Sequence, residues 1–197
     1  MDIAGYTAIA DVGDTLLHLL REHMVPDIIP QPELIGLGSP ADDKNDMALT
    51  LYLYLVKESG EIRRNEMVPK GTTKMQFPPV SLDLYYLVTA HSKSEAHVRH
   101  LDEHRILGKV IQIFYDNSIL RGPQLRGSLA ETNEEVRIVM NDLSLDVAIQ
   151  FFPDMPYKLS LSYAVGPVYI DSTRIRTTRR VLESEVRVEE LRYDGRG

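Results

Sequence analysis

The sequence predicts a small mixed α/β (α+β) domain: a mainly antiparallel sheet of about four or five strands, two or three covering helices and an extended C-terminal arm. Three segments alternate apolar and polar residues with a period of two, as a strand buried on one face requires: Ala48–Val56, Val80–Ala90 and Tyr157–Val165. Segments between them repeat apolar residues at helical spacing. The chain has 197 residues, 43% of them hydrophobic, which suits one core of moderate size.

The first expected element is an amphipathic helix over Asp11–Met24, with Asp11 as its N-cap. Pro26 and Pro30 follow at once, and proline cannot continue a helix because its ring fixes φ and removes the N–H donor. A short strand is expected at Leu34–Leu37, ahead of a Gly-Ser-Pro turn.

Two polar stretches interrupt the regular elements. Lys57–Phe77 carries mixed charges and little periodicity, which predicts either an exposed hairpin or a mobile loop. Arg121–Asn133 is rich in Gly, Pro and polar residues and is expected to be a loop.

The longest helix is expected over Glu95–Asn117, a strand over Glu135–Met140 and a third helix over Leu145–Phe152 with Ser144 as its cap. Position 147 is Val, so the reciprocal capping box is missing. The apolar face assigned to the long helix consists of Val98, Leu101, Leu107, Val110, Ile111 and Phe114.

Charge divides the chain into an acidic body, residues 1–171, and a C-terminal arm, residues 172–197. The arm holds seven Arg against five acidic residues, whereas the body holds fifteen Lys/Arg and twenty-four Asp/Glu. A basic arm on an acidic body is suited to docking on a neighbouring subunit. The alternative is a frayed terminus, although Val181, Val186 and Val188 give the arm some capacity to form a strand.

Several classes of protein are disfavoured by composition. The net charge of −7 argues against nucleic acid as the main partner, since its phosphates attract clustered positive charge. Cysteine is absent, which excludes disulfides and thiolate chemistry. No signal peptide is recognised at the amino terminus, and no apolar run reaches the roughly 20 residues that a membrane span needs. We therefore expect synthesis and folding in the cytoplasm, without a membrane partner.

Histidines near the start of the long helix raise the question of a metal site. His97, His100 and His104 fall at i, i+3 and i+7, a spacing that can bind zinc, and His91 precedes them. A small metal-dependent enzyme built on these three is the rival hypothesis. The interpretation that the sequence favours is a solvated helix start, because the His-Glu-x-x-His pattern is missing.

Tyrosines mark the polar side of two predicted strands. Tyr52 and Tyr54 share one strand face, and Asp83 and Tyr85 share another. Aromatic residues are favoured at the cores of interfaces, so this face could contact a partner. A covering helix would instead make the same rings part of the core, and both alternatives stay open.

The order of these segments resembles the cap, or tail-terminator, proteins of extracellular contractile injection systems of the antifeeding-prophage type. No single motif carries the resemblance; the joint order and spacing do, over roughly residues 8–171. The segments concerned are Ile9–Val12, Leu37–Pro40, Leu49–Leu55, Leu82–Ala90, His104–Gly108, Val136–Ile138, Leu143–Leu145 and Pro156–Tyr163.

The resemblance implies a tail-terminator-like fold that assembles into a ring, expected to be a hexamer, at the end of the particle distal to its baseplate. There it would stop growth of the inner tube and anchor the last layer of sheath, with tube and sheath proteins as partners and no cofactor or catalysis. A connector of a DNA-containing contractile phage is an alternative with the same physics. Candidates for contact with acidic partner surfaces are Arg174, Arg176, Arg179 and Arg180.

Overall fold

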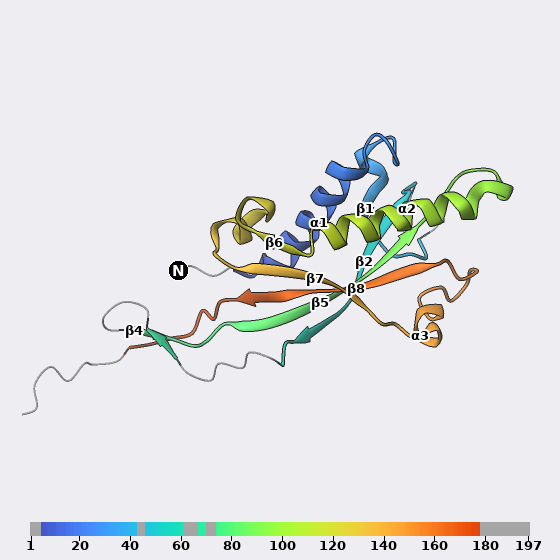
Figure 1. Cartoon of the computed structure of the whole chain (residues 1–197). Helices are drawn as coiled ribbons and strands as arrows, with labels where there is room; N and C mark the ends of the chain where they lie inside the picture. Colours follow the sequence, from blue (N-terminus) through green and yellow to red (C-terminus); the bar gives the residue numbers. More distant parts are fainter. Residues whose placement is uncertain (1–4, 43–45, 61–66, 70–73, 178–197) are drawn as a thin grey trace, which may run out of the picture.

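The computed structural model describes residues 5–42, 46–60, 67–69 and 74–177 (Figure 1). Three α-helices, α1 (Ala8–Met24), α2 (Ala96–Asp116) and α3 (Leu145–Ile149), combine with two sheets. The strands of the larger sheet are β1 (Ile35–Leu37), β2 (Leu49–Glu58), β5 (Val80–Ala90), β6 (Ile119–Arg121), β7 (Glu135–Asn141) and β8 (Ser160–Ile170). The smaller sheet holds β3 (Val68–Pro69), β4 (Lys74–Gln76) and β9 (Ile175–Thr177). Short 3-10 turns lie at Pro32–Leu34, Gly122–Gln124 and Gly127–Glu131.

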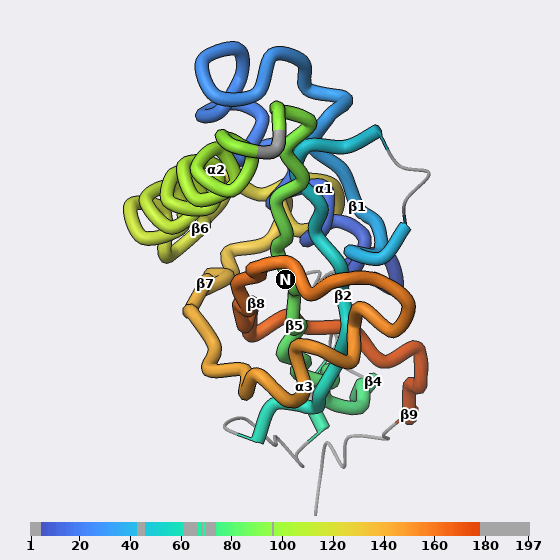
Figure 2. The backbone as a smooth tube through the Cα atoms, turned by 90° about the vertical axis from the view of Figure 1, so that its right-hand side faces the viewer, coloured from blue at the N-terminus to red at the C-terminus, as the bar shows by residue number. Residues whose placement is uncertain are grey.

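The larger sheet has six strands in the order β1-β2-β5-β8-β7-β6. All neighbours are antiparallel except β1 and β2. This confirms the predicted fold class, with one strand more than the four or five expected, because β6 (Ile119–Arg121) lies at the junction of the predicted helix and the predicted loop, where no strand was expected. Helices α1 and α2 cover one face of the sheet and α3 lies on the other (Figures 1 and 2).

The core fills the space between the sheet and the first two helices. Leu16 and Leu20 of α1 and Phe114 of α2 are buried in the same core cluster as Leu51 of β2 and Tyr86 of β5. Burying each such side chain stabilises the fold by about 1.5–3 kcal/mol before the entropy of ordering is counted. The core therefore packs on β2 and β5, two of the strands that the alternation of apolar and polar residues predicted.

Irregular register bends the sheet at its middle. The pairing of β2 with β5 shifts between Leu53 and Leu55, and that of β5 with β8 shifts between Leu82 and Leu84. Each shift is a β-bulge, which adds a residue to one strand and increases the local twist. The simple alternation expected across Ala48–Val56 therefore breaks, and Leu55 is 36% exposed.

Helix α1 begins at Ala8, three residues before the predicted N-cap. Asp11 therefore lies inside the first turn and does not cap the helix. Its carboxylate instead accepts hydrogen bonds from the backbone N–H of Ser128 (3.0 Å) and from the Ser128 hydroxyl (2.5 Å). The same carboxylate accepts a bond from the Thr7 hydroxyl at 3.1 Å. Asp11 thus ties the 3-10 turn at Gly127–Glu131 to the helix.

Three other boundaries differ from the prediction. The third helix ends at Ile149, three residues early, and Ser144 occupies its N-cap without a side-chain hydrogen bond. The last long strand runs over Ser160–Ile170, so Tyr157 and Leu159 precede it and are 37% and 49% exposed. The strand begins at Ser160, the first residue that pairs with β5, opposite Thr89.

The long helix α2 matches its predicted range, but its buried face is rotated. Ile106 and Ile113 are buried, whereas Leu101 and Ile111 of the predicted face are 52% and 40% exposed. The first turns of α2 extend past the end of the sheet (Figure 1), so apolar residues there have no strand beneath them. Within the described residues no helix is both long and apolar enough to cross a bilayer.

The polar stretch at 57–77 begins as a continuation of β2 and later supplies β3 and β4, which pair antiparallel. The hairpin alternative is therefore confirmed for the part that the structure describes. Strand β9, from the first residues of the predicted arm, pairs antiparallel with β4. The remainder of the arm, including Val181, Val186 and Val188, lies outside the described residues.

Candidate assembly surfaces

The face of the sheet opposite α1 and α2 carries the tyrosine cluster found in the sequence, and the segment that follows α3 covers half of it. The ring of Phe151 lies 5.2 Å from that of Tyr54 and 6.2 Å from that of Tyr52. The Tyr54 hydroxyl is 2.9 Å from the Ser162 hydroxyl, to which the Asn141 side-chain amide also donates at 3.1 Å. Phe151 therefore packs on the rings of Tyr52 and Tyr54, and both tyrosines are half-buried.

Beyond this cover a polar groove remains on the same face. It has a volume of about 340 Å³, and its walls include Asp83, Tyr85, Arg137 and Gly166. The Lys57 ammonium lies 5.3 Å from the centre of the Tyr85 ring, an arrangement that favours a cation–π contact. Glycine is required at 166 because a Cβ there would lie 2.7 Å from the Asp83 carboxylate and 2.9 Å from a β5 carbonyl.

Helix α3 carries three exposed apolar side chains, Leu145, Val147 and Ile149, which do not share one helix face because they stand at positions i, i+2 and i+4; we call this helix the ledge. Their side chains are 59%, 41% and 46% exposed. The buried residue of this short helix is Ala148, which leaves the larger side chains facing outward. Asp142 and Asp146 flank the ledge and both are exposed. Between Arg137 and Lys158 the sequence has no Lys or Arg, so the segment that contains α3 is acidic.

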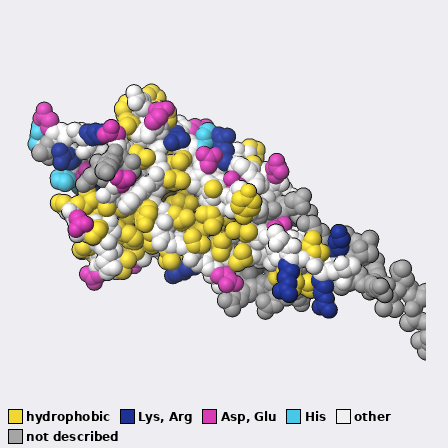
Figure 3. All heavy atoms as spheres, turned by 180° about the vertical axis from the view of Figure 1, so that it is seen from behind, with side chains coloured by type: hydrophobic (Ala, Val, Ile, Leu, Met, Phe, Trp, Pro, Cys, Tyr) yellow, Lys and Arg dark blue, Asp and Glu magenta, His cyan; other side chains and the backbone are white. Residues whose placement is uncertain are grey.

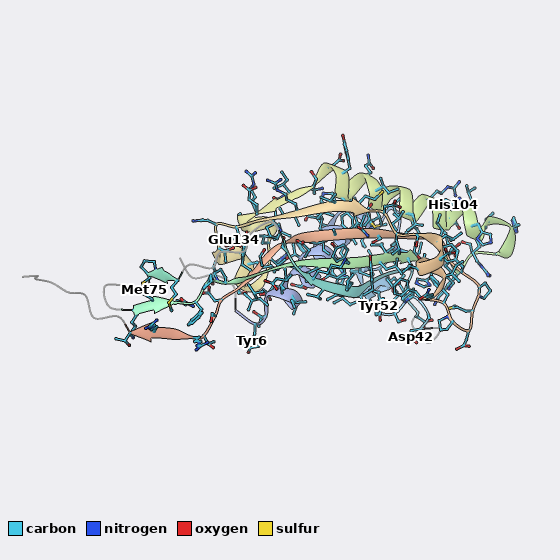
Figure 4. The ribbon with its side chains drawn as sticks, turned by 90° about the horizontal axis from the view of Figure 1, so that it is seen from below. Tyr6, Asp42, Tyr52, Met75, His104 and Glu134 are labelled. Carbon is cyan, nitrogen blue, oxygen red and sulfur yellow. The ribbon has the colours of Figure 1, made fainter. Side chains whose placement is uncertain are left out.

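The smaller sheet projects from the opposite end of the molecule (Figures 1 and 4), and we call it the tip. Arg174 and Arg176 lie on it, both exposed, together with Lys74 and the 47% exposed Ile175. The Arg174 guanidinium packs 4.5 Å above the Phe77 ring, which limits its freedom. Lys and Arg side chains gather on this projection in Figure 3. The other two predicted contact residues, Arg179 and Arg180, lie outside the described residues.

The histidines do not come together as a metal site in the structure. The His97 ring is 3.4 Å from the Glu95 carboxylate and the His100 ring is 3.1 Å from the Glu103 carboxylate, both on an exposed helix surface. His104 is exposed as well (Figure 4). His91 lies elsewhere, 2.9 Å from the Thr50 hydroxyl and 3.1 Å from the Lys158 ammonium. Among the described residues, no group of three or more His, Cys, Asp or Glu is placed to hold a metal ion.

An open cleft of about 620 Å³ lies between the start of α2 and the segment that follows α1. Sequence reasoning did not find it, because its walls come from four separate segments. Two acidic groups of the wall form ion pairs: Asp46 with Lys93 at 2.6 Å and Asp102 with Arg105 at 3.0 Å. The Lys93 ammonium, by hydrogen bond and charge, lowers the pKa of the fully exposed Asp46 carboxyl. These pairs neutralise part of the wall's charge.

The fold is similar to solved structures of two cap proteins. A structure of the sheath/tube terminator of PVC, an extracellular contractile injection system, in the extended state superposes with a TM-score of 0.68 at 19% identity. The alignment covers 97% of this chain and 65% of that one. The tube-terminating cap of the anti-feeding prophage gives a TM-score of 0.61 at 18% identity, over 91% of this chain and 61% of the cap.

This chain therefore spans less than two thirds of the length of either terminator. No curated protein sequence matches it. The family model of the Pvc16 N-terminal domain, in contrast, matches residues 11–184, which includes both sheets, α2, α3 and all of α1 after its first three residues. The predicted resemblance to tail-terminator caps is thereby confirmed, and the chain belongs to the Pvc16 N-terminal domain family.

Proposed function

We propose that this chain is the structural cap, or tail terminator, of a contractile injection particle, which ends polymerisation of the inner tube and anchors the last layer of sheath. The observation that carries the proposal is the likeness of nearly the whole chain, 97%, to a sheath/tube terminator at a TM-score of 0.68. It acts as a homo-oligomeric ring, a hexamer by the family resemblance, without enzymatic activity.

The physical task of such a cap is asymmetric. A growing tube presents the same open interface after every added ring, because its contacts are heterologous and do not close along the axis. A terminator must match that interface with one face and offer no copy of it on the other. Its partners are then the inner-tube protein, the sheath protein and further copies of itself.

The tip supplies contacts for this task. Arg174 and Arg176 are exposed on a projecting sheet, which places two guanidinium groups within reach of a neighbouring acidic surface. Arg179 and Arg180 continue the basic run in sequence. Assembly takes place in the cytoplasm, and the completed particle can be released from the cell.

Electron microscopy of particles made with and without this chain tests the proposal. Without it we expect overlong or ragged tubes and sheaths that detach, and re-expression of the full chain should restore normal particles. If particles of normal length with firmly attached sheaths form in its absence, the terminator function is wrong. Zinc analysis of the purified protein tests the metal-enzyme alternative, which requires stoichiometric metal that is lost when His97, His100 and His104 are replaced by Ala.

A further inference from the structure

Strand β2 has an outer side that β1 covers only at its start. The two strands pair from Leu49 to Leu51, whereas β2 continues to Glu58. β2 is the outermost long strand on this side of the sheet (Figure 1), and among the described residues no strand pairs with the outer side of residues 52–57. We call this stretch the open edge; it is long enough to hold a whole further strand.

Two hydrogen bonds show which backbone groups point outward from the open edge. The carbonyl of Leu51 accepts a bond from the N–H of Gly38 at 3.1 Å, on the side away from β5. The N–H of Ser59 donates to a β5 carbonyl at 2.8 Å, on the opposite side. Because these directions alternate along a strand, the N–H and C=O groups of Leu53 and Val56 point outward. No described residue forms a hydrogen bond with them.

The side chains along the open edge are largely apolar and exposed. Every residue from Leu55 to Glu58 is exposed, with Leu55 at 36% and Val56 at 41%. Val56 pairs with the buried Leu84 and so lies on the helical face of the sheet, whereas Leu55 lies on the α3 face. Proteins usually protect a long edge with a cover or a proline, and β2 contains no proline. Apolar side chains on both faces of such an edge favour the addition of another strand.

Lys57 adds a positive charge to the α3 face of this edge. Its ammonium lies 5.3 Å from the centre of the Tyr85 ring. Its register partner is Asp83, yet among the ion pairs between described residues none includes Lys57. Apolar pairs and opposite charges across neighbouring strands both stabilise a sheet. A strand that matches this edge therefore has apolar side chains beside Leu55 and Val56 and a carboxylate beside Lys57.

We propose that the open edge of β2 receives an extended segment of another protein of the particle, with this side-chain pattern, as an added strand. In such additions the main-chain hydrogen bonds supply affinity and the flanking side chains supply specificity. A second copy of this chain fits less well. The other edge of its sheet is the three-residue strand β6, and pairing two β2 edges about a twofold axis closes a dimer. The proposal rests on the proposed function, in which the cap joins other proteins of the particle.

Amide hydrogen exchange tests the added strand without any substitution. In the purified chain the outward amides of Leu53 and Val56 have no partner among the described residues, so we expect them to exchange rapidly. In purified particles the same amides should exchange at least tenfold more slowly, because the added strand accepts their hydrogen bonds. Mass spectrometry of peptides that cover residues 50–58 measures both rates. Peptides from the centre of β5, which is paired on both sides, should exchange equally in the two samples and serve as the control.

Substitution of Val56 separates the role of the backbone from that of the side chain. Val56→Pro removes an outward N–H, and proline is tolerated on a strand edge where that N–H makes no ladder bond. Val56→Ala shortens the side chain and keeps the N–H. We expect incorporation of the proline variant into particles to fall at least fivefold, by immunoblot against the inner-tube protein, and that of the alanine variant to fall less than twofold. Both variants should keep Tm within about 3 °C of the unmodified chain.

Each other occupant of the open edge gives a different result. Slow exchange of the outward amides in the dilute purified chain would assign the edge to a segment of the chain itself, and slowing that increases with concentration would assign it to a second copy. Either result would overturn the proposal. Equally rapid exchange in particles and in the purified chain would also overturn it, and would leave the terminator function intact if tube length still depends on the chain. Particles of normal length made without the chain would overturn the terminator function itself.

Discussion

The bond between Asp11 and the turn at 127–131 should make Gly127 one of the most sensitive surface positions in the protein. Gly127 has φ +56°, in the left-handed region, and a Cβ there would lie 2.2 Å from the Asp11 carboxylate oxygen. In Gly127→Ala the left-handed backbone costs about 1 kcal/mol. The carboxylate must also move away from Ser128, and a hydrogen bond to a charged group contributes about 1.5–3 kcal/mol. We therefore expect a loss of about 2.5–4 kcal/mol in the free energy of unfolding.

Gly122 offers a matched control in the same loop. Its φ is +47° and nothing lies within 4 Å of the place that a Cβ would occupy, so Gly122→Ala should cost only the backbone term, about 1 kcal/mol. Urea unfolding followed by far-UV circular dichroism measures both, and each kcal/mol should correspond to roughly 2–4 °C in Tm. The Asp11→Ala/Gly127→Ala double variant should lose much less than the sum of the single changes. Equal losses for the two glycine variants would refute the reasoning, because the Asp11 contact would then contribute nothing.

Four further outcomes follow from described contacts. Tyr163 is buried with no hydrogen-bond partner for its hydroxyl among the described residues, and burial raises its pKa to about 12. Its neutral form is favoured by folding, so its contribution to stability should be constant below pH 10 and fall at up to about 1.4 kcal/mol per pH unit between pH 10 and 12. Tyr163→Phe should reduce this slope in urea titrations and Tyr115→Phe should not; identical slopes would contradict the assignment. Phe151→Ala should cost about 2–3 kcal/mol by uncovering Tyr52 and Tyr54, measured by urea unfolding, and a loss below about 0.5 kcal/mol would show that the cover is loose. Replacing His97, His100 and His104 by Ala should change Tm by less than about 2 °C, since the rings are exposed, and a larger loss would indicate a role that the described contacts lack. Deleting residues 172–197 should leave the six-stranded domain folded by circular dichroism but abolish capping in particle micrographs; unchanged capping would remove the arm from the mechanism.

Strand positions were the most predictable part of the fold. The range of β5 matches its prediction at both ends, because eleven residues alternate with one face over a packed core. The start of β8 was predicted wrongly. Tyr157 and Leu159 continue the alternation of apolar residues, but they precede the strand and are exposed. Periodicity shows which side chains share a face and does not show where the neighbouring strand stops.

The candidate surfaces were harder to predict than the fold. From the sequence, the tyrosine face could be either a partner interface or a covered part of the core. The contact between Phe151 and Tyr54 decides for the cover, and the sequence could not predict it because the two residues are almost a hundred positions apart. The sequence did not predict β6, because a three-residue segment is too short to show a repeating pattern of apolar residues. This strand is defined by its antiparallel pairing with β7. The residues around Asp11 predicted a helix N-cap. Its carboxylate instead accepts a hydrogen bond from Ser128, a residue far away in sequence that only the tertiary fold brings close.

The exposed cations of the tip, Lys74, Arg174 and Arg176, attract acidic surfaces to this end of the molecule. A partner with an acidic surface that approaches by diffusion is therefore turned toward the tip before any side chain touches. Such steering raises the association rate constant far more than it slows dissociation. Because the Debye length shrinks from about 10 Å at 0.1 M salt to about 3 Å at 1 M, the rate of assembly should fall with ionic strength while the lifetime of a completed assembly stays nearly constant. The charge of the tip thus acts mainly on the association rate constant and only weakly on the lifetime of the completed assembly.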